Sequence, residues 1–389
     1  MTDSWASTAS RMKVLTDRDE EWNLRMEMIR RAERFILLTT YYFGSDERSG
    51  TMADALAAAA RRGVRVVLVV DSFGHRLSRN LSKASERPKL AERLRAIDAA
   101  GGLVVSYKPS SLRHRLVGGG AHIKIQVSEK GVAVFGSSNI ARQSFSHWNE
   151  ASLELEGAIV ALLVQEACRL ARLGDDETAA LTDLLPSKWA DEPRLAVRYV
   201  REDPASRSGG LFPFGAVSNR LTDQLVAFID RAERSLAISS LYCKPASALK
   251  DALVRACRRG VDVELFHSHR DSLGVTHIPW IPASFHSGSI QKEGARVYEN
   301  RAGEHSKVLL VDDREVAIGS YNLEHAAHDR LVEAMIFTDD VATCDRFRTM
   351  FETLRRSAGN PALTPGWLRE LPLNLQVKRW LFRPLERWI

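Results

Sequence analysis

The chain repeats a polar motif 183 residues further on, and this duplication constrains the fold more than any other feature of the sequence. The stretch AHIKIQVSEKGVAVFGSSN at residues 121 to 139 returns as EHSKVLLVDDREVAIGSYN at residues 304 to 322. The residues that keep this spacing are His122/His305, Lys124/Lys307, Gly136/Gly319, Ser137/Ser320, Asn139/Asn322 and Glu150/Glu333. Polar identity across a duplication has little packing rationale, so we interpret these pairs as functional.

A second set of similar stretches shows that the repeat covers whole lobes. IRRAERFILLTTYY (29 to 42) is matched by IDRAERSLAISSLY (229 to 242), and AAARRGVRVVLVV (58 to 70) by RACRRGVDVELFH (255 to 267). Each half shows helical spacing, an apolar strand, a helix ending at Arg-Arg-Gly and a second apolar strand, with Gly63 and Gly260 expected to end these helices. This βαβ rhythm predicts an α/β fold with helices on both faces of each sheet.

The repeat and the composition between its copies define the expected domains. We expect an N-terminal lobe at residues 1–173, a linker at 174–192, a C-terminal lobe at 193–357 and a basic, aromatic tail at 358–389. The linker stretch LGDDETAALTDLLPSKWADEPR loses the βαβ rhythm and carries acid and proline. Two similar α/β/α lobes are expected to pack about a pseudo-two-fold axis, with the active site at their interface.

The repeated histidine and lysine stand two residues apart, so in a strand their side chains share one face. Where the two lobes meet, both pairs would converge on one point. Two ammonium groups there suit the non-bridging oxygens of a phosphodiester, and Asn139 and Asn322 would donate further hydrogen bonds. The Ser-x-Asn segment is also expected to place backbone N–H groups at a helix N-terminus, which favours an anion.

Two histidines can divide covalent catalysis between them with no metal and no cofactor. One neutral imidazole attacks phosphorus, while the other, protonated, gives its proton to the leaving alkoxide and later activates the incoming hydroxyl. A nucleophilic histidine needs an acceptor on its other ring nitrogen. Glu150 and Glu333, each 28 residues after its motif histidine, are the candidates. The sequence leaves open whether each serves its own lobe's histidine or the other's.

The pattern H-x-K-x4-D-x6-G-S-x-N, present twice, resembles the motif of the phospholipase D superfamily. Both copies have the serine after the glycine, Ser137 and Ser320. The second copy fits the pattern fully with Asp312, whereas the first copy has Glu129 at the acidic position. Glu129 falls in a predicted hairpin turn, so we expect tuning rather than loss of activity. The stretch TTYYFGSDERSGTMADALAAAARRGVRVVLVVDSFG is similar to the first half of bacterial cardiolipin synthases. The resemblance covers residues 11 to 357.

The resemblance implies transfer of a phosphatidyl group from one phospholipid, typically phosphatidylglycerol, to the hydroxyl of another, with hydrolysis as a side reaction. It also implies that His122 is the nucleophile and that His305 is the acid and base. The same double motif serves phospholipase D hydrolases, other phosphodiesterases and nucleases, so these stay alternatives. A non-catalytic membrane-bound scaffold is a further alternative, although it would tend to lose one of the four motif side chains.

The overall charge does not distinguish a lipid partner from a nucleic-acid partner, because 55 Lys and Arg residues against 49 Asp and Glu residues leave a net charge of only +6. The basic stretch Arg-His-Arg at residues 113–115 could contact lipid headgroups or a DNA backbone equally well. The glycines at 118–120 indicate a flexible loop. No recognised nucleic-acid module is present. The tail interleaves Trp367, Trp380 and Trp388 with Arg and Lys, which is typical of a segment bound to an anionic membrane. A helix packed on the second lobe is the alternative.

The N-terminal stretch has no apolar core of a signal peptide, and no apolar run reaches the ~18 residues of a membrane span. Four cysteines without C-x-x-C spacing indicate a reducing compartment and no metal site. We therefore expect a cytoplasmic protein attached peripherally to the inner face of the membrane. The expected partner is an anionic phospholipid such as phosphatidylglycerol rather than nucleic acid, and the sequence does not define the oligomeric state.

Overall fold

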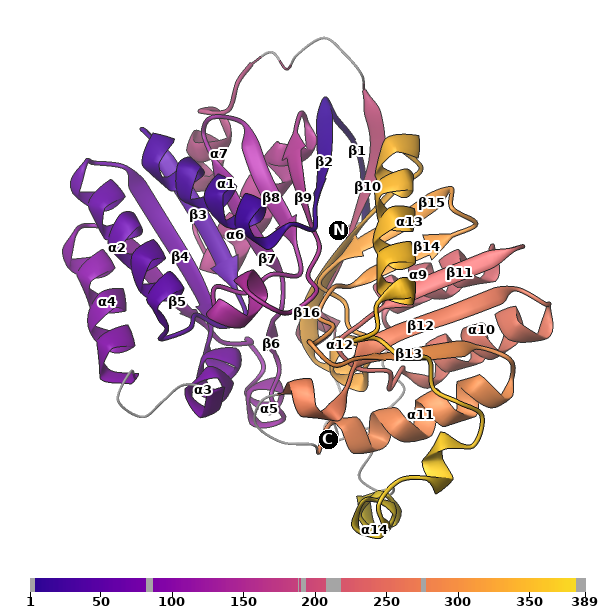
Figure 1. Cartoon of the computed structure of the whole chain (residues 1–389). Coiled ribbons are helices and arrows are strands. Elements are labelled where there is room, and N and C mark those ends of the chain that lie inside the picture. The colour runs from indigo at the N-terminus through magenta and orange to yellow at the C-terminus, as the bar shows by residue number, and fades with distance from the viewer. Residues whose placement is uncertain are drawn as a thin grey trace.

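A computed structural model describes residues 4–81, 87–187, 189, 194–207, 218–273 and 278–382, which form two α/β lobes side by side (Figure 1). The N-terminal sheet has the order β2 (Arg11–Leu15), β9 (Ser152–Glu156), β8 (Val132–Gly136), β7 (Lys124–Ser128), β3 (Phe35–Thr40), β4 (Arg65–Asp71), β5 (Leu103–Tyr107). The C-terminal sheet has the order β1 (Ser4–Ala9), β10 (Leu195–Glu202), β16 (Leu331–Thr338), β15 (Glu315–Gly319), β14 (Val308–Val311), β11 (Ser235–Ser239), β12 (Asp262–Ser268), β13 (Arg296–Asn300). The predicted fold class is confirmed.

The repeated βαβ units form the parallel part of each sheet. In the first lobe, α2 (Glu47–Arg61) connects β3 to its parallel neighbour β4, and in the second lobe α10 (Ser247–Arg258) connects β11 to β12. Both helices end as predicted, because Gly63 and Gly260 adopt the left-handed φ values of 89° and 85° that follow a helix C-terminus.

Three helical layers enclose the two sheets. The outer faces are covered by α1 (Arg18–Arg31), α2 and α4 (Arg87–Ala99) on the first lobe, and by α9 (Arg220–Asp230) and α10 on the second. Helices α6 (Ile159–Ala171) and α13 (Val341–Arg356) lie between the sheets (Figure 1). Strand residues alternate between these layers, so Phe35 and Leu37 join the central core while Ile36 and Leu38 join the outer one. One hydrophobic core therefore continues from lobe to lobe.

Two strands cross from the first part of the chain into the C-terminal sheet. Strand β1 pairs antiparallel with β10, with Ser4 opposite Val200. Strand β6 (Gly120–Ala121) pairs parallel with β16, with Gly120 opposite Leu331. The prediction of a flexible loop at residues 118–120 is wrong, because Gly120 is buried within this pairing. The β6 crossing places the first motif directly beside β16 of the other lobe.

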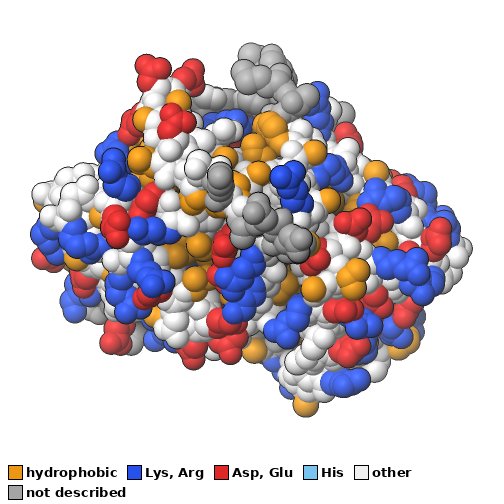
Figure 2. Space-filling model, turned by 90° about the horizontal axis from the view of Figure 1, so that it is seen from above, with side chains coloured by type: hydrophobic (Ala, Val, Ile, Leu, Met, Phe, Trp, Pro, Cys, Tyr) orange, Lys and Arg blue, Asp and Glu red, His pale blue; other side chains and the backbone are white. Residues whose placement is uncertain are grey.

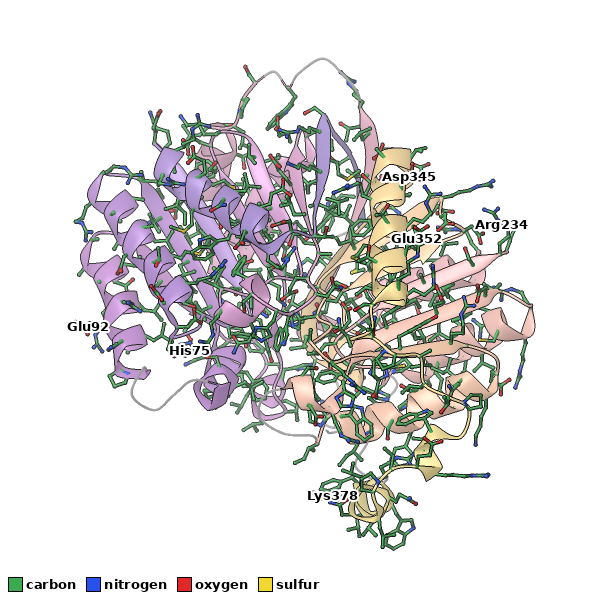
Figure 3. The ribbon with its side chains drawn as sticks, viewed as in Figure 1. His75, Glu92, Arg234, Asp345, Glu352 and Lys378 are labelled. Carbon is green, nitrogen blue, oxygen red and sulfur yellow. The ribbon has the colours of Figure 1, made fainter. Side chains whose placement is uncertain are left out.

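Short helices gather at the end of the molecule that lies lowest in Figure 1. They are α3 (Ser72–Leu81), α5 (Leu112–Leu116), α11 (Trp280–Lys292) and α14 (Leu373–Phe382). In Figure 3, His75 on α3 and Lys378 on α14 mark this end. The upper face, seen in Figure 2, instead intersperses basic and acidic side chains. None of the described helices is long and apolar enough to cross a membrane.

The remaining short elements connect these layers. They are α7 (Asp175–Thr182), α8 (Pro204–Arg207), α12 (His325–Asp329), η1 (Arg142–Phe145), η2 (Arg270–Leu273) and η3 (Trp367–Arg369). The predicted linker at 174–192 contains α7, and its last part falls largely outside the described residues. Trp388 and the other tail residues after Phe382 also lie outside them.

Candidate active site

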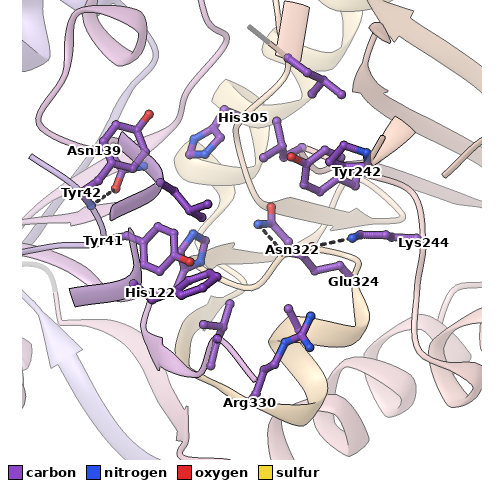
Figure 4. Close-up of a pocket in the computed structure, with 18 of the residues that line it drawn as sticks. Tyr41, Tyr42, His122, Asn139, Tyr242, Lys244, His305, Asn322, Glu324 and Arg330 are labelled. Carbon is purple, nitrogen blue, oxygen red and sulfur yellow. Dashed lines mark hydrogen bonds and ion pairs between the residues drawn. The ribbon is translucent and has the colours of Figure 1, made fainter. Parts of the chain in front are cut away.

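The motif histidines and lysines meet at the interface of the two lobes. His122 and His305 are 4% and 3% exposed and line one cavity of about 420 Å³, together with Asn139 and Asn322 (Figure 4). Each histidine is anchored to the opposite lobe through its backbone. The N–H of His122 donates to the carbonyl oxygen of Val332 at 2.9 Å, and that of His305 donates to Asn149 at 2.8 Å. The site therefore exists only where both lobes are packed together.

The prediction that each histidine stands within a strand is wrong. His122 lies in the link between β6 and β7, and His305 lies before β14, because their N–H groups are committed to the opposite lobe. The lysines are fully buried and do not line the cavity. The Lys124 Nζ donates to the carbonyl oxygen of His122 at 2.6 Å, and Lys307 makes the same bond to His305. Each lysine nitrogen therefore lies behind its motif histidine, one hydrogen bond from that histidine's backbone.

Each histidine is held by the glutamate of the opposite lobe, which answers the question that the sequence leaves open. His122 Nδ1 lies 3.0 Å from Glu333 Oε1 and 2.9 Å from the carbonyl oxygen of Ser320, and His305 Nδ1 lies 2.8 Å from Glu150 Oε2. The motif serines complete these contacts, with Ser137 donating to Glu150 at 2.5 Å and Ser320 donating to Glu333. With Nδ1 engaged in this way, Nε2 of each histidine is the nitrogen left for a substrate.

The two histidine–glutamate pairs differ in charge. Burial lowers the pKa of both histidines, to about 4 for His305, so both are neutral near pH 7 before substrate binds. At Glu150, burial acts to raise the pKa, but the attraction of His305 when it is protonated, the charge of Lys307 and the hydrogen bonds from His305 and Ser137 outweigh burial and hold the pKa at about 2. At Glu333, burial prevails and raises the pKa well above its usual value. The carboxylate beside His305 is therefore the better partner for an imidazolium.

The two motif asparagines present opposite groups to the cavity. Asn139 Oδ1 accepts from the Tyr42 backbone N–H at 3.4 Å, which leaves its buried Nδ2 without a partner. Asn322 Nδ2 donates to Glu324 Oε1 at 3.1 Å, which leaves its Oδ1 without one. The prediction that both amides donate fits the unpartnered Nδ2 of Asn139, whereas at Asn322 Glu324 accepts one of the two amide hydrogens.

The predicted helix N-terminus after each Ser-x-Asn segment is also wrong. The helices η1 and α12 begin only at Arg142 and His325, after a turn in each lobe. The N–H groups of Ala141 and Glu324, which such a site would use, donate back to the carbonyl oxygens of Asn139 and Asn322. Anion binding at this site therefore depends on side chains.

A family model described as "Cardiolipin synthase, PLD-like domain" matches residues 26–169 and 225–355, one segment in each lobe. The chain belongs to this family. It is 24% identical over 352 residues to the major cardiolipin synthase of Bacillus subtilis, covering 87% of this chain and 67% of that protein. It is 25% identical to cardiolipin synthase B of Salmonella typhimurium, covering 89% of this chain and 79% of that protein. The chain thus spans about two thirds of the length of the Bacillus relative.

A solved structure shows the same fold. The crystal structure of phosphatidylserine synthase from Haemophilus influenzae superimposes with a TM-score of 0.71 at 16% sequence identity, covering 98% of this chain and 96% of that one. The resemblance to the phospholipase D superfamily, closest to cardiolipin synthases, is confirmed.

The acidic motif position of this phospholipase D-like site lies at the hairpin turn, away from the cavity. Asp312 accepts backbone hydrogen bonds from residues 233, 234 and 235 at 2.7 to 3.0 Å. Glu129 holds the same turn in the first lobe by accepting from Glu33 at 2.9 Å and Phe35 at 3.1 Å. This equivalence supports the prediction that Glu129 tunes activity and does not abolish it.

Several cavity residues of this family member carry no signal in the repeated motif. The Tyr41 ring meets His122 edge-on at 4.7 Å, and the Trp148 ring stacks on His305 at 4.9 Å. Lys244, Glu324 and Arg330 add charge from the second lobe only. The sequence carries an indirect indication that these two residues belong to the site, because Tyr41 lies in a repeated stretch and Trp148 stands two residues before Glu150. In the part of the chain that the structure describes, no group of three or more His, Cys, Asp or Glu side chains could hold a metal ion.

The buried Lys307 predicts how phosphodiester turnover depends on pH. Burial lowers its pKa to about 8, so the free protein loses this cation as the pH rises through that value. We expect kcat/KM to fall above about pH 8, and kcat to fall at higher pH because bound phosphate favours the ammonium. A pH–rate profile measured in detergent micelles checks this. Burial also lowers the pKa of Lys124, so Lys307→Arg, which fixes one of the two charges, should make the alkaline limb shallower, and Lys307→Arg combined with Lys124→Arg should remove it. A wild-type kcat/KM that stays flat to pH 10 would contradict it.

Proposed function

We propose that this chain is a phosphatidyltransferase of cardiolipin synthase type, which moves a phosphatidyl group between phospholipids through a phosphohistidine. One observation carries the proposal: two histidines from different lobes line one cavity, each with Nδ1 bound to a glutamate and Nε2 left free to react. Membership of the cardiolipin synthase family supports the lipid substrate. Phosphatidylglycerol is the proposed donor.

In the first step, His122 Nε2 attacks phosphorus, a P–N bond forms, and the bond from phosphorus to the headgroup oxygen breaks. The anionic phosphate favours the imidazolium form of His305, which Glu150 stabilises, and His305 gives its proton to the leaving alkoxide. The ammonium groups and Asn139 Nδ2 stabilise the charge on the phosphoryl oxygens. In the second step, the acceptor hydroxyl gives its proton to His305, its oxygen bonds to phosphorus, and the P–N bond breaks.

Product analysis with phosphatidylglycerol vesicles tests this function. We expect the purified protein to form cardiolipin and glycerol in the presence of EDTA, and the His122→Ala variant to form neither. Phosphatidic acid as the sole lipid product would indicate a hydrolase. Cleavage of single-stranded DNA without lipid turnover would indicate a nuclease and would refute the proposal.

We further propose that the chain binds the membrane surface with the end at which the cavity opens. Leu77 lines the cavity and is 42% exposed, while Leu112 and Leu116 on α5 are 68% and 79% exposed and precede the cavity residue Val117. We call Leu77, Leu112 and Leu116 the apolar rim. Apolar side chains around the mouth allow a lipid to enter without crossing water. The inner face of the membrane stays the prediction made from the sequence.

Helix α14 combines the two readings that the sequence allows for the tail. One side packs on α11, where Leu375 joins the cluster around Trp280, and Arg379 donates to Ser284 at 2.8 Å. The other side exposes an apolar stripe at helical spacing, made of Leu373, Val377, Trp380 and Leu381. Because α14 lies at the same end as α5 (Figure 1), this stripe supports the proposed membrane-binding end.

Removing the apolar rim should weaken membrane binding. We expect the double substitution Leu112→Ser and Leu116→Ser to lower affinity for phosphatidylglycerol vesicles by roughly 10- to 100-fold, since each leucine loses part of its transfer free energy. Turnover of a soluble short-chain phospholipid should stay the same. Val341 is a matched control, because it is 73% exposed and is the first residue of α13, whose Asp345 lies at the opposite end from Lys378 (Figure 3). Vesicle sedimentation in which Val341→Ser loses as much affinity as the double variant would contradict the proposal.

A further inference from the structure

The two halves of the cavity are unequal although the lobes are duplicated. The Lys244 N–H donates to the carbonyl oxygen of Leu323 at 2.9 Å, as the Gly44 N–H donates to that of Ile140 at 2.7 Å. Lys244 therefore takes the place of Gly44. By the 183-residue spacing, Glu324 takes the place of Ala141. The second lobe thus has a buried ion pair, Lys244 Nζ to Glu324 Oε2 at 3.3 Å, where the first lobe has two small residues.

Arg330 adds a third charged group on the same side. Its counterpart in the first lobe is His147, which is exposed and does not line the cavity. Arg330 is half-buried and lines the cavity, with its side chain on the same side as Glu324 (Figure 4). Its backbone oxygen accepts from Gly120 N–H at 3.3 Å, which ties it to the segment that leads to His122. No hydrogen bond or ion pair to its guanidinium occurs among the described residues.

Hydrogen-bonding character also differs between the halves. The first lobe offers a donor, Asn139 Nδ2, which suits a phosphoryl oxygen. The second lobe offers acceptors, the unpartnered Oδ1 of the buried Asn322 and the carboxylate of Glu324. Acceptor oxygens recognise hydroxyl groups, and a guanidinium recognises phosphate. This half of the cavity therefore matches a ligand that carries hydroxyls next to a second phosphate.

We propose that Asn322, Glu324 and Arg330 form an acceptor subsite for the glycerophosphate headgroup of a second phospholipid. The inference rests on the proposed function, in which the donor phosphate occupies the centre between the histidines. Arg330 binds the phosphate of the acceptor, and the oxygens of Asn322 and Glu324 orient its glycerol hydroxyls. The terminal hydroxyl then attacks the phosphorus bound to His122, its proton passes to His305 Nε2, and the P–N bond breaks.

Arg330→Gln tests the subsite through the distribution of products. The probe is phosphatidylglycerol vesicles with labelled free glycerol, and the initial rates measured are cardiolipin formation, incorporation of glycerol into phosphatidylglycerol, and release of phosphatidic acid. All three products share the first step and differ only in the acceptor. We expect Arg330→Gln to lower cardiolipin formation about 10- to 100-fold, since only the lipid acceptor carries a phosphate. The other two rates should not fall, and they should rise where more of the shared intermediate is left to react with glycerol and water.

Two further variants sharpen the result. Arg330→Lys should restore part of the cardiolipin rate because it keeps the positive charge. Arg346→Gln, an exposed arginine on α13 that does not line the cavity, should change none of the three rates. An equal loss of all products in Arg330→Gln would place Arg330 in the first step and overturn the subsite alone. A wild-type protein that releases only phosphatidic acid would overturn the proposed function and the subsite with it.

Discussion

Replacing His122 by alanine is expected to lower phosphatidyl transfer by on the order of 10⁴-fold or more, because it removes the proposed nucleophile that forms the covalent intermediate. His122 lines the cavity, and its Nδ1 lies 3.0 Å from Glu333, which leaves Nε2 to react. Cardiolipin formation from phosphatidylglycerol vesicles measures the loss. His147→Ala is a matched control, since that histidine is exposed outside the cavity and should be replaceable without effect.

The His305→Ala variant separates the two roles. It should also be strongly impaired with phosphatidylglycerol, yet it keeps the nucleophile and should still accept a phosphatidyl group from an ester with a good leaving group. If His305→Ala lost this reaction while His122→Ala retained it, the two roles would be reversed.

Glu150→Gln and Glu333→Gln should each lower turnover by about 10²-fold, through the histidine of the opposite lobe. The amide keeps the size of the side chain. It removes the negative charge of Glu150, and at position 333 it leaves one acceptor oxygen where the carboxyl group has two, which contact His122 and Ser320. Glu150→Gln weakens the acid His305, so a p-nitrophenyl phosphatidyl ester, whose leaving group needs no proton, should largely restore its first step. Glu333→Gln affects the nucleophile and should stay impaired with both substrates.

Glu154→Gln on β9, four residues after Glu150, is a control for these substitutions. Glu154 pairs with Arg11 and lies outside the cavity. Burst kinetics with the activated ester provide the measurement. Rescue of Glu333→Gln with no rescue of Glu150→Gln would mean that each glutamate serves the opposite role from the one proposed here.

The duplication predicted more of this site than any single motif could. It predicted two lobes and a meeting point, because polar residues such as His122 and His305 keep one spacing with no packing reason to do so. The two glutamates were predicted as partners of the histidines, but which glutamate serves which histidine was not predictable. The pairing depends on β6, a strand of only Gly120–Ala121, which crosses to β16 and is too short to show a period.

The differences between the lobes could not be predicted from the repeat either. A repeat identifies the residues that the two lobes share. Lys244, Glu324 and Arg330 instead distinguish the second half of the cavity, because their counterparts in the first lobe are different residues. Glu324 stands two residues after Asn322 and reverses the group that this amide presents to the cavity. The position of α14 could not be predicted, because α14 packs on a surface of α11 that is available only in the folded chain.

The most direct test of the account is to identify the covalent intermediate. A single-turnover reaction with phosphatidylglycerol labelled in the phosphatidyl group, stopped under alkaline denaturing conditions, preserves a phosphohistidine for peptide mapping by mass spectrometry. We predict a phosphatidyl group on His122, lost in His122→Ala and chased into cardiolipin by unlabelled phosphatidylglycerol. Label on His305 would reverse the assignment, and transfer to cardiolipin with no labelled histidine would contradict the two-step mechanism.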